Sequence, residues 1–138
     1  MTIVSFSFTK IVAEKKSSIQ GKVQIQNNIA IKEITKTDIA LGKNTQKGLK
    51  YVFEYIARYE PKIGEISLTG EIIAIEDEKV IEKVFEDWKK EKKVAKDVLD
   101  ILLNQILTKS NIEALLMSRE INLPPSMPMQ KVKFGMPK

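Results

Sequence analysis

The hydrophobic pattern of this 138-residue chain changes its period near Glu76. Before that residue, apolar and polar side chains alternate, as Phe6 and Phe8 do with Ser5 and Ser7, and this is the period of a half-buried strand. After it, apolar residues recur at helical spacing, as in Val84 and Trp88. Because all strands precede all helices, we expect an α+β fold, with helices on one face or end of an antiparallel sheet.

The alternation predicts four strands within residues 1–76. The second strand changes the parity of its apolar residues at Ile34, which predicts a bulge near Glu33. Residues 42–48 are polar and predict a loop, and Gly70 predicts a bulge or strong twist in the fourth strand. Strands three and four form a long antiparallel hairpin around the turn at 61–64. One face of strand three carries Leu49, Tyr51, Phe53, Tyr55, Ala57 and Tyr59.

Residues 77–121 predict two or three helices. Asp77 is the expected N-cap of the first helix. Acidic residues lie at the start of this helix and lysines at its end, which matches the charges of the helix dipole. The stretch 94–121 fits one continuous helix, or two if Ser110 and Glu113 form a capping box. We expect one domain over 1–138, with a sheet (1–76), helices (77–121) and an extended Pro/Met tail (122–138). The predicted apolar stripe of the long helix is Val98, Leu99, Leu102, Ile106, Ile112, Leu115 and Leu116.

The chain contains neither cysteine nor histidine. Disulfides and thiolate metal sites are therefore excluded. The usual general base and the Ser-His and Cys-His nucleophile pairs are missing as well. We expect no enzymatic activity, no metal and no cofactor, and we favour a binding protein.

The charge balance is 23 basic against 18 acidic residues, a net charge of +5. Such an excess is typical of nucleic-acid-binding proteins, but only Arg58 and Arg119 are arginine, the residue that best contacts phosphate and guanine. Most lysines alternate with glutamates, as on a solvated surface. The Lys/Glu-rich, cysteine-free composition also suits a thermophile's protein.

The N-terminal residues have no basic segment followed by a long apolar run, and no apolar run reaches the length of a membrane span. We therefore expect a cytoplasmic protein.

The aromatic residues of two strands are the first candidate site. Phe6 and Phe8, with Tyr51, Phe53 and Tyr55, line a groove for apolar segments of another protein, or form the core face against the helices. Met127 and Met129, in the Pro-rich tail, are further candidates, because methionine adapts to varied partners. The same tail could instead pack along its own domain.

A second candidate is the lysine run beside the only tryptophan. Trp88, Lys89, Lys90, Lys92 and Lys93 contact nucleic acid or an anionic partner, or form a helix end with solvated lysines. The acidic pairs elsewhere are explained by helix ends and solvated helix faces.

The order of these segments resembles the SecB-type export chaperones. Residues 6–11 are similar to that family's first strand, residues 51–56 and 72–75 to its central hairpin, and residues 123–134 to its Pro-containing segment. The resemblance implies four antiparallel strands followed by helices, dimers or tetramers, and apolar grooves that hold unfolded polypeptides without ATP.

Three features depart from that family. This chain is basic where its bacterial members are acidic, the helix around Trp88 is additional, and no final helix follows Phe134. An archaeal-type or toxin–antitoxin-associated relative fits better than a bacterial export factor. We therefore expect an ATP-independent, homo-oligomeric holdase. The alternative is a nucleic-acid-binding module that uses lysines and exposed strand aromatics.

Overall fold

The computed structural model describes residues 1–19 and 21–126. The four strands and two helices follow one another as the change of period predicts. The elements are β1 (Thr2–Lys15), β2 (Gln24–Leu41), β3 (Asn44–Glu60), β4 (Gly64–Ile75), α1 (Glu78–Glu91) and α2 (Lys96–Glu120).

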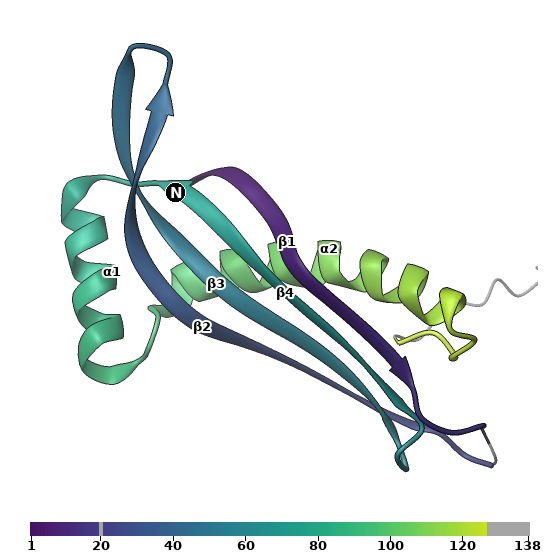
Figure 1. The fold of residues 1–138 in the computed structure, drawn as a ribbon. Coiled ribbons are helices and arrows are strands. Elements are labelled where there is room, and N and C mark those ends of the chain that lie inside the picture. The colour runs from purple at the N-terminus through teal and green to yellow at the C-terminus, as the bar shows by residue number, and fades with distance from the viewer. Residues whose placement is uncertain (20, 127–138) are drawn as a thin grey trace, which may run out of the picture.

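The strands form one antiparallel sheet in the order β1-β4-β3-β2. The β3–β4 hairpin therefore occupies the centre, and β1 and β2 are the edges (Figure 1). The connection from β1 to β2 crosses the end of the sheet, where the backbone N–H groups of Lys16 and Ser17 donate to the carbonyl of Ile63. Each edge strand consequently has one strand neighbour within the described residues.

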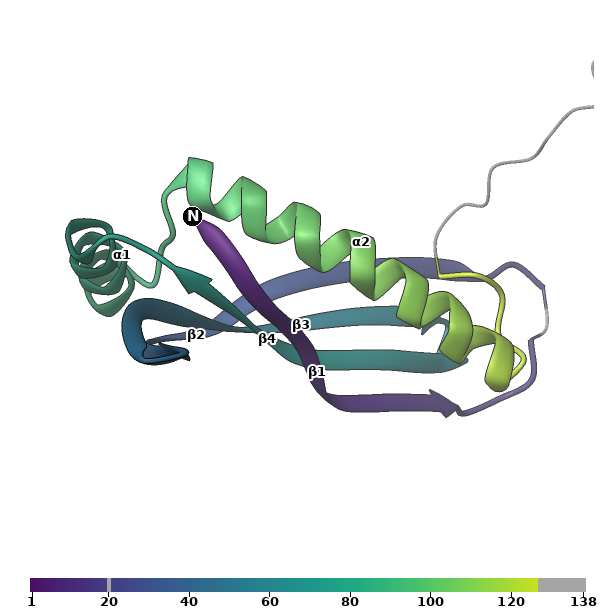
Figure 2. The same ribbon diagram turned by 90° about the horizontal axis from the view of Figure 1, so that it is seen from above.

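Both helices pack on the same side of the sheet. Figure 2 shows α2 running along one face and α1 at one end. Ile81, Val84 and Trp88 of α1 join Leu102 and Ile106 of α2 in one buried cluster with the inner residues of β3 and β4. The predicted α+β architecture is confirmed, with two helices, and α2 is one continuous helix. Ser110 lies buried inside α2, so it is not a cap.

The inner face of β3 is the row that the alternation predicts. All six of its side chains, from Leu49 to Tyr59, are at most 1% exposed. On β4 the inner face is aliphatic and includes Ile66, Leu68 and Ile72. The residues that alternate with this inner row lie on the outer face of the sheet. Many of them are charged, as expected for a sheet with one face covered.

Two of the three irregularities in strand pairing lie near predicted positions. The β2–β3 register shifts between Ile31 and Glu33, which confirms the predicted bulge. Gly70 of β4 pairs with Phe8 of β1. The register shift at this point lies in β1, between Phe8 and Lys10, and not in β4, where the bulge was expected. A Cβ at Gly70 would lie 2.6 Å from Cζ of Phe53, so glycine makes room for that ring.

The prediction of a loop at 42–48 is wrong. Gly42 and Lys43 form a two-residue turn, and β3 already begins at Asn44. Gly42 has a positive φ of 63°, which favours glycine in such a turn. The residues before Gly48, from Asn44 to Lys47, pair only with β2, and together with it they form a ribbon that projects past the sheet (Figure 1). This ribbon is polar because it has no helix to cover it, so its sequence resembles a loop.

Candidate functional site

The aromatic residues of the central strand lie in the core. Tyr51, Phe53 and Tyr55 are each 0% exposed, beneath the helices. Of the two interpretations of this row, the structure therefore supports the core face. The three rings line no open groove in this conformation, because α1 and α2 cover the inner face of β3.

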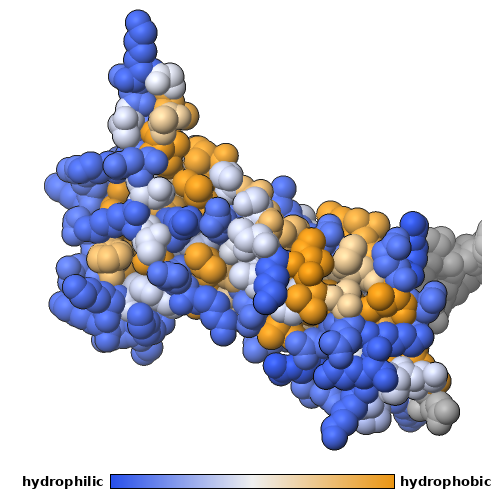
Figure 3. Space-filling model, viewed as in Figure 1, coloured by the Kyte–Doolittle hydropathy of each residue, from blue (hydrophilic) through white to orange (hydrophobic). Residues whose placement is uncertain are grey.

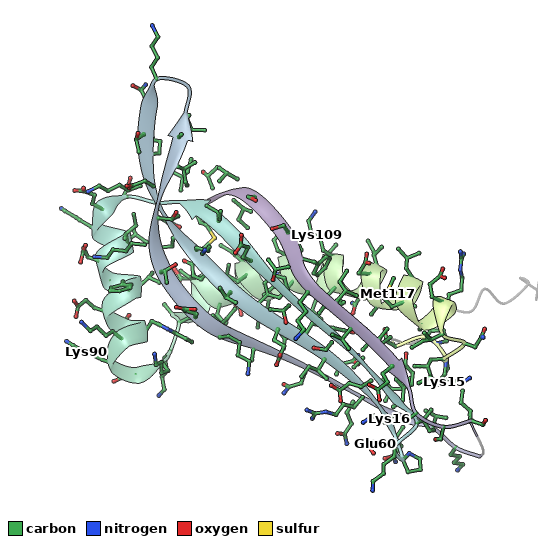
Figure 4. The ribbon with its side chains drawn as sticks, viewed as in Figure 1. Lys15, Lys16, Glu60, Lys90, Lys109 and Met117 are labelled. Carbon is green, nitrogen blue, oxygen red and sulfur yellow. The ribbon has the colours of Figure 1, made fainter. Side chains whose placement is uncertain are left out.

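Phe6 and Phe8 lie at the edge of that core. Both rings are only partly buried, and they pack against Phe53 with ring centroids 5.1 and 6.2 Å from its own. The ammonium group of Lys109, on α2, lies 5.3 Å from the centre of the Phe6 ring. The Lys109 side chain of α2 thus reaches a ring of β1, and Figure 4 shows Lys109 close to that strand.

The outer side of α2 carries aliphatic side chains. Ile112 is 59% exposed, and Ile101 and Leu116 are each 46% exposed. Leu116 follows Lys109 by seven residues, about two turns, so it lies on the side of α2 that faces β1. The prediction that Ile112 and Leu116 belong to one buried stripe is wrong, because the buried ridge is formed by Leu102, Ile106, Ser110, Ala114 and Ser118.

Strand β1 adds apolar residues next to this helix side. Ile11 pairs with the buried Leu68, so it lies on the face that α2 covers, yet it remains exposed. Val12, on the opposite face, is exposed as well. Figure 3 shows apolar patches along β1 and over the part of α2 visible beyond it. We call Phe6, Phe8, Ile11, Ile112 and Leu116 the β1–α2 surface.

The outer face of the sheet has a different character. Cross-strand ion pairs cover it, among them Lys50 with Glu71 at 3.7 Å and Arg58 with Glu65 at 3.6 Å. The second arginine, Arg119, lies 3.9 Å from the carboxylate of Glu120. Both arginines therefore lie beside carboxylates, and neither offers the unneutralised positive charge that phosphate recognition requires.

The lysine run surrounds a tryptophan that is largely buried. Trp88 is 8% exposed, and the ammonium group of Lys92 lies 5.2 Å from the centre of its ring. Lys89, Lys90, Lys92 and Lys93 take part in none of the ion pairs found within residues 1–19 and 21–126. The four lysines therefore lie exposed at the end of α1, where Figure 4 shows Lys90 pointing outward.

Three tyrosine hydroxyl groups are the polar groups of the inner face. Burial raises the pKa of Tyr59 to about 12 and also raises the pKa of Tyr51 and Tyr55 above the ordinary phenol value. The hydroxyl of Tyr59 donates to the carbonyl of Pro124 at 2.6 Å. The phenols thus stay neutral at physiological pH, and Tyr59 links the core to the Pro-containing segment.

The start of the Pro/Met tail is anchored to the domain. Asn27 on β2 donates its side-chain amide to the carbonyl of Ser126 at 3.0 Å, which adds to the Tyr59–Pro124 bond. Leu123 is buried in the cluster beneath the C-terminal half of α2. Met127 and Met129 lie outside the described residues, so their role stays a prediction.

In the described part of the chain, no group of three or more acidic residues gathers where a metal ion could be held. None of the helices there is long and apolar enough to cross a membrane.

Comparison with known proteins gives one structural neighbour. No protein-family model matches the chain, and no curated protein matches its sequence. The fold is similar to that of a SecB-like chaperone from Mycobacterium tuberculosis, solved in complex with a ChAD peptide from the HigA1 antitoxin. The TM-score is 0.50 at 8% identity, over 98% of this chain and 92% of that one. The two proteins share a fold along nearly their whole length.

Proposed function

We propose that this protein binds extended apolar segments of non-native polypeptides without ATP, as a homo-oligomer. The observation that carries the proposal is the β1–α2 surface, where exposed aliphatic side chains lie beside an edge strand. Contiguous exposed apolar patches mark sites of protein interaction. The fold shared with a peptide-binding SecB-like chaperone agrees with this function.

Capture would combine two interactions. Apolar side chains of the client would bury Ile11, Ile112 and Leu116, and this burial contributes about 25 cal/mol per Å². The free backbone edge of β1 would add main-chain hydrogen bonds to an extended segment, which are independent of the client's sequence. Because no covalent step is involved, binding would compete with aggregation at equilibrium and need no nucleotide.

Buried aromatics would support the surface indirectly. Phe53 packs against Phe6 and Phe8, and those two rings flank α2. In this proposal Phe6 and Phe8 contact the client at the edge. Tyr51, Phe53 and Tyr55 pack in the core beneath the helices and do not touch the client.

Self-association is the second part of the proposal. A helix with aliphatic side chains on its outer side is normally covered. Ile101, near the start of α2, is the exposed large apolar residue of that helix furthest from Leu116. We assign Ile101 and its neighbours to contact with a second copy, which leaves Ile112 and Leu116 for clients. Light scattering should give a dimer or tetramer, and a monomer would contradict this part.

The test of client binding is suppression of aggregation of a chemically unfolded model protein. The double substitution Ile112→Glu and Leu116→Glu should abolish most suppression, since it places two charges in the apolar surface. The matched control is Gln105→Glu with Thr108→Glu, which adds the same charge to exposed positions of the same helix. Equal activity of the two double variants, or no suppression by the unmodified protein at stoichiometric amounts, would overturn the proposal.

Nucleic-acid binding remains the alternative. It requires unpaired cations with exposed aromatics, whereas Tyr51, Phe53 and Tyr55 are buried and Arg58 lies beside Glu65. This alternative predicts an electrophoretic mobility shift at low salt that disappears as salt rises.

A further inference from the structure

A pocket lies between the end of α1, the start of α2 and strand β2. Its volume is ≈ 290 Å³, and it is open to solvent. Ile31, Trp88, Val94 and Leu99 form apolar walls, and Lys92 and Lys93 form the rim. Because β2 and β1 are opposite edges of the sheet, this pocket lies apart from the β1–α2 surface.

The charge around the pocket comes from side chains. Residues 88–93 contain four lysines and one acidic residue, Glu91. The helix dipoles oppose one another here, because α1 ends and α2 begins at the pocket. Lys92 and Lys93 belong to none of the ion pairs in the described ranges, whereas Lys36 and Lys47 pair with Glu82 and Glu78 at 2.7 and 2.8 Å. The rim thus offers positive charge that is not neutralised within those ranges.

We propose that this pocket binds an acidic segment of another polypeptide. The segment places one large aliphatic or aromatic side chain against Ile31, Val94 and Leu99, and its carboxylates at Lys92 and Lys93. The apolar walls would contact that side chain, and the lysines of the rim would pair with the acidic residues beside it in the peptide. The backbone of Lys92 is fixed at the end of α1, where its N–H donates to the carbonyl of Trp88 and its φ is 55°.

The pocket favours a peptide over a nucleic acid. A base needs an exposed aromatic face on which to stack. The Trp88 ring is largely buried, and the Lys92 ammonium lies over it. Lysine provides a point charge without the planar fork with which arginine recognises phosphate. A single aliphatic or aromatic side chain fits the apolar walls better than a stacked strand.

The test uses the fluorescence of Trp88, the only tryptophan. The full chain is titrated with an end-blocked peptide, Gly-Glu-Leu-Leu-Glu-Gly. Two matched peptides replace either both glutamates by glutamine or both leucines by serine. The acidic-apolar peptide should bind at least roughly three- to tenfold more tightly than either, as two ion pairs at an exposed rim allow. Raising NaCl to about 0.5 M should remove most of the advantage over the glutamine peptide.

Variants identify the residues. Lys92→Gln with Lys93→Gln should reduce affinity for the acidic peptide to that for the glutamine peptide. Lys22→Gln with Lys43→Gln removes the same charge at remote exposed positions and should leave affinity unchanged. Leu99→Ala should weaken binding of both leucine-containing peptides. Far-UV circular dichroism checks that each variant folds, and calorimetry measures binding independently of Trp88.

Four outcomes would overturn the proposal. They are equal affinity for the acidic and glutamine peptides, equal loss in the two lysine double variants, no binding by calorimetry, and tighter binding of an oligothymidine that depends on Lys92 and Lys93. None of these bears on aggregation suppression, so the pocket and the proposed chaperone function fail or stand separately.

Discussion

The two helices lie on the same side of the sheet but use their apolar residues differently. In α1, Ile81, Val84 and Trp88 are buried, and the outer side carries charged residues. In α2, a buried ridge faces the sheet, yet Ile101, Leu107, Ile112 and Leu116 remain exposed. The apolar residues of α1 thus serve the fold, whereas α2 carries more apolar surface than residues 1–19 and 21–126 cover. Such a helix is expected to meet a partner.

The largest effect on the free energy of unfolding should distinguish the buried side of α2 from its exposed side. Ile106→Ala removes a fully buried side chain and should lower the free energy of unfolding by about 2–5 kcal/mol. Ile112→Ala is the same substitution on the outer side and should change it by less than about 0.5 kcal/mol. Urea unfolding at low protein concentration measures both. An equal loss at Ile112 would show that the outer side is packed in the native assembly.

Alkaline pH should act on the contact of α2 with the sheet. Tyr55 donates to Asn111 of α2 at 3.3 Å, and Tyr59 holds the segment that follows α2. Because burial raises the pKa of Tyr59 to about 12, the neutral phenol is favoured in the folded state. Its stabilisation is complete below the ordinary phenol pKa near 10 and is lost as pH rises from there to about 12. The urea midpoint should fall over this range.

The control for this pH effect is Tyr59→Phe, which removes the titrating group. Its urea midpoint should fall less between pH 9 and pH 11 than that of the unmodified chain, although other buried phenols remain. Absorbance at 295 nm should show phenols that ionise only as the protein unfolds. Ordinary titration of all three tyrosines near pH 10 in the folded protein would contradict the burial seen here.

A smaller effect should appear in the binding of an apolar dye. Ile112→Ser with Leu116→Ser removes two of the four exposed aliphatic side chains of α2 and should lower dye fluorescence by roughly half. Glu86→Ser with Lys90→Ser, on the outer side of α1, should leave the fluorescence unchanged. A similar decrease in both variants would remove the contrast between the helices.

The smallest effect concerns the charged start of α1. The ammonium group of Lys47 lies 2.8 Å from the carboxylate of Glu78, and this hydrogen bond lowers the pKa of Glu78. The stabilisation is present above the ordinary pKa of Glu78 and is lost as pH falls through its lowered value. Because both groups are exposed, Glu78→Gln should shift the urea midpoint only slightly, and salt should remove the shift. A shift unaffected by salt would indicate another cause.

Much of the fold follows from local patterns. The alternation along β3 predicts its buried row, and the change of parity at Ile34 predicts the bulge near Glu33. These predictions succeed because a strand points successive side chains to opposite faces wherever it lies in the sheet. The projecting ribbon was missed for the same reason, since residues exposed on both faces show no alternation.

The candidate surfaces were less predictable. The aromatic residues of β3 were candidates for binding, but α2 and α1 bury them. Ile112 and Leu116 belonged to the predicted core stripe, yet they lie on the outer side of α2. A helix with apolar residues on several sides does not define which side faces the sheet. The signal for a second interface was already in the sequence, because the apolar residues of α2 occupy more than one face of the helix.

By itself, the sequence determined the order of strands and helices, the inner face of the central hairpin, and the absence of cysteine and histidine chemistry. These depend on residue type and on spacing along the chain. Only the tertiary structure decided that β1 lies at an edge beside α2, that Lys109 covers Phe6, and that Trp88 meets Ile31 and Leu99 in one pocket. Exposure is a property of the whole packing arrangement, because burying a side chain requires a neighbour that is distant in sequence.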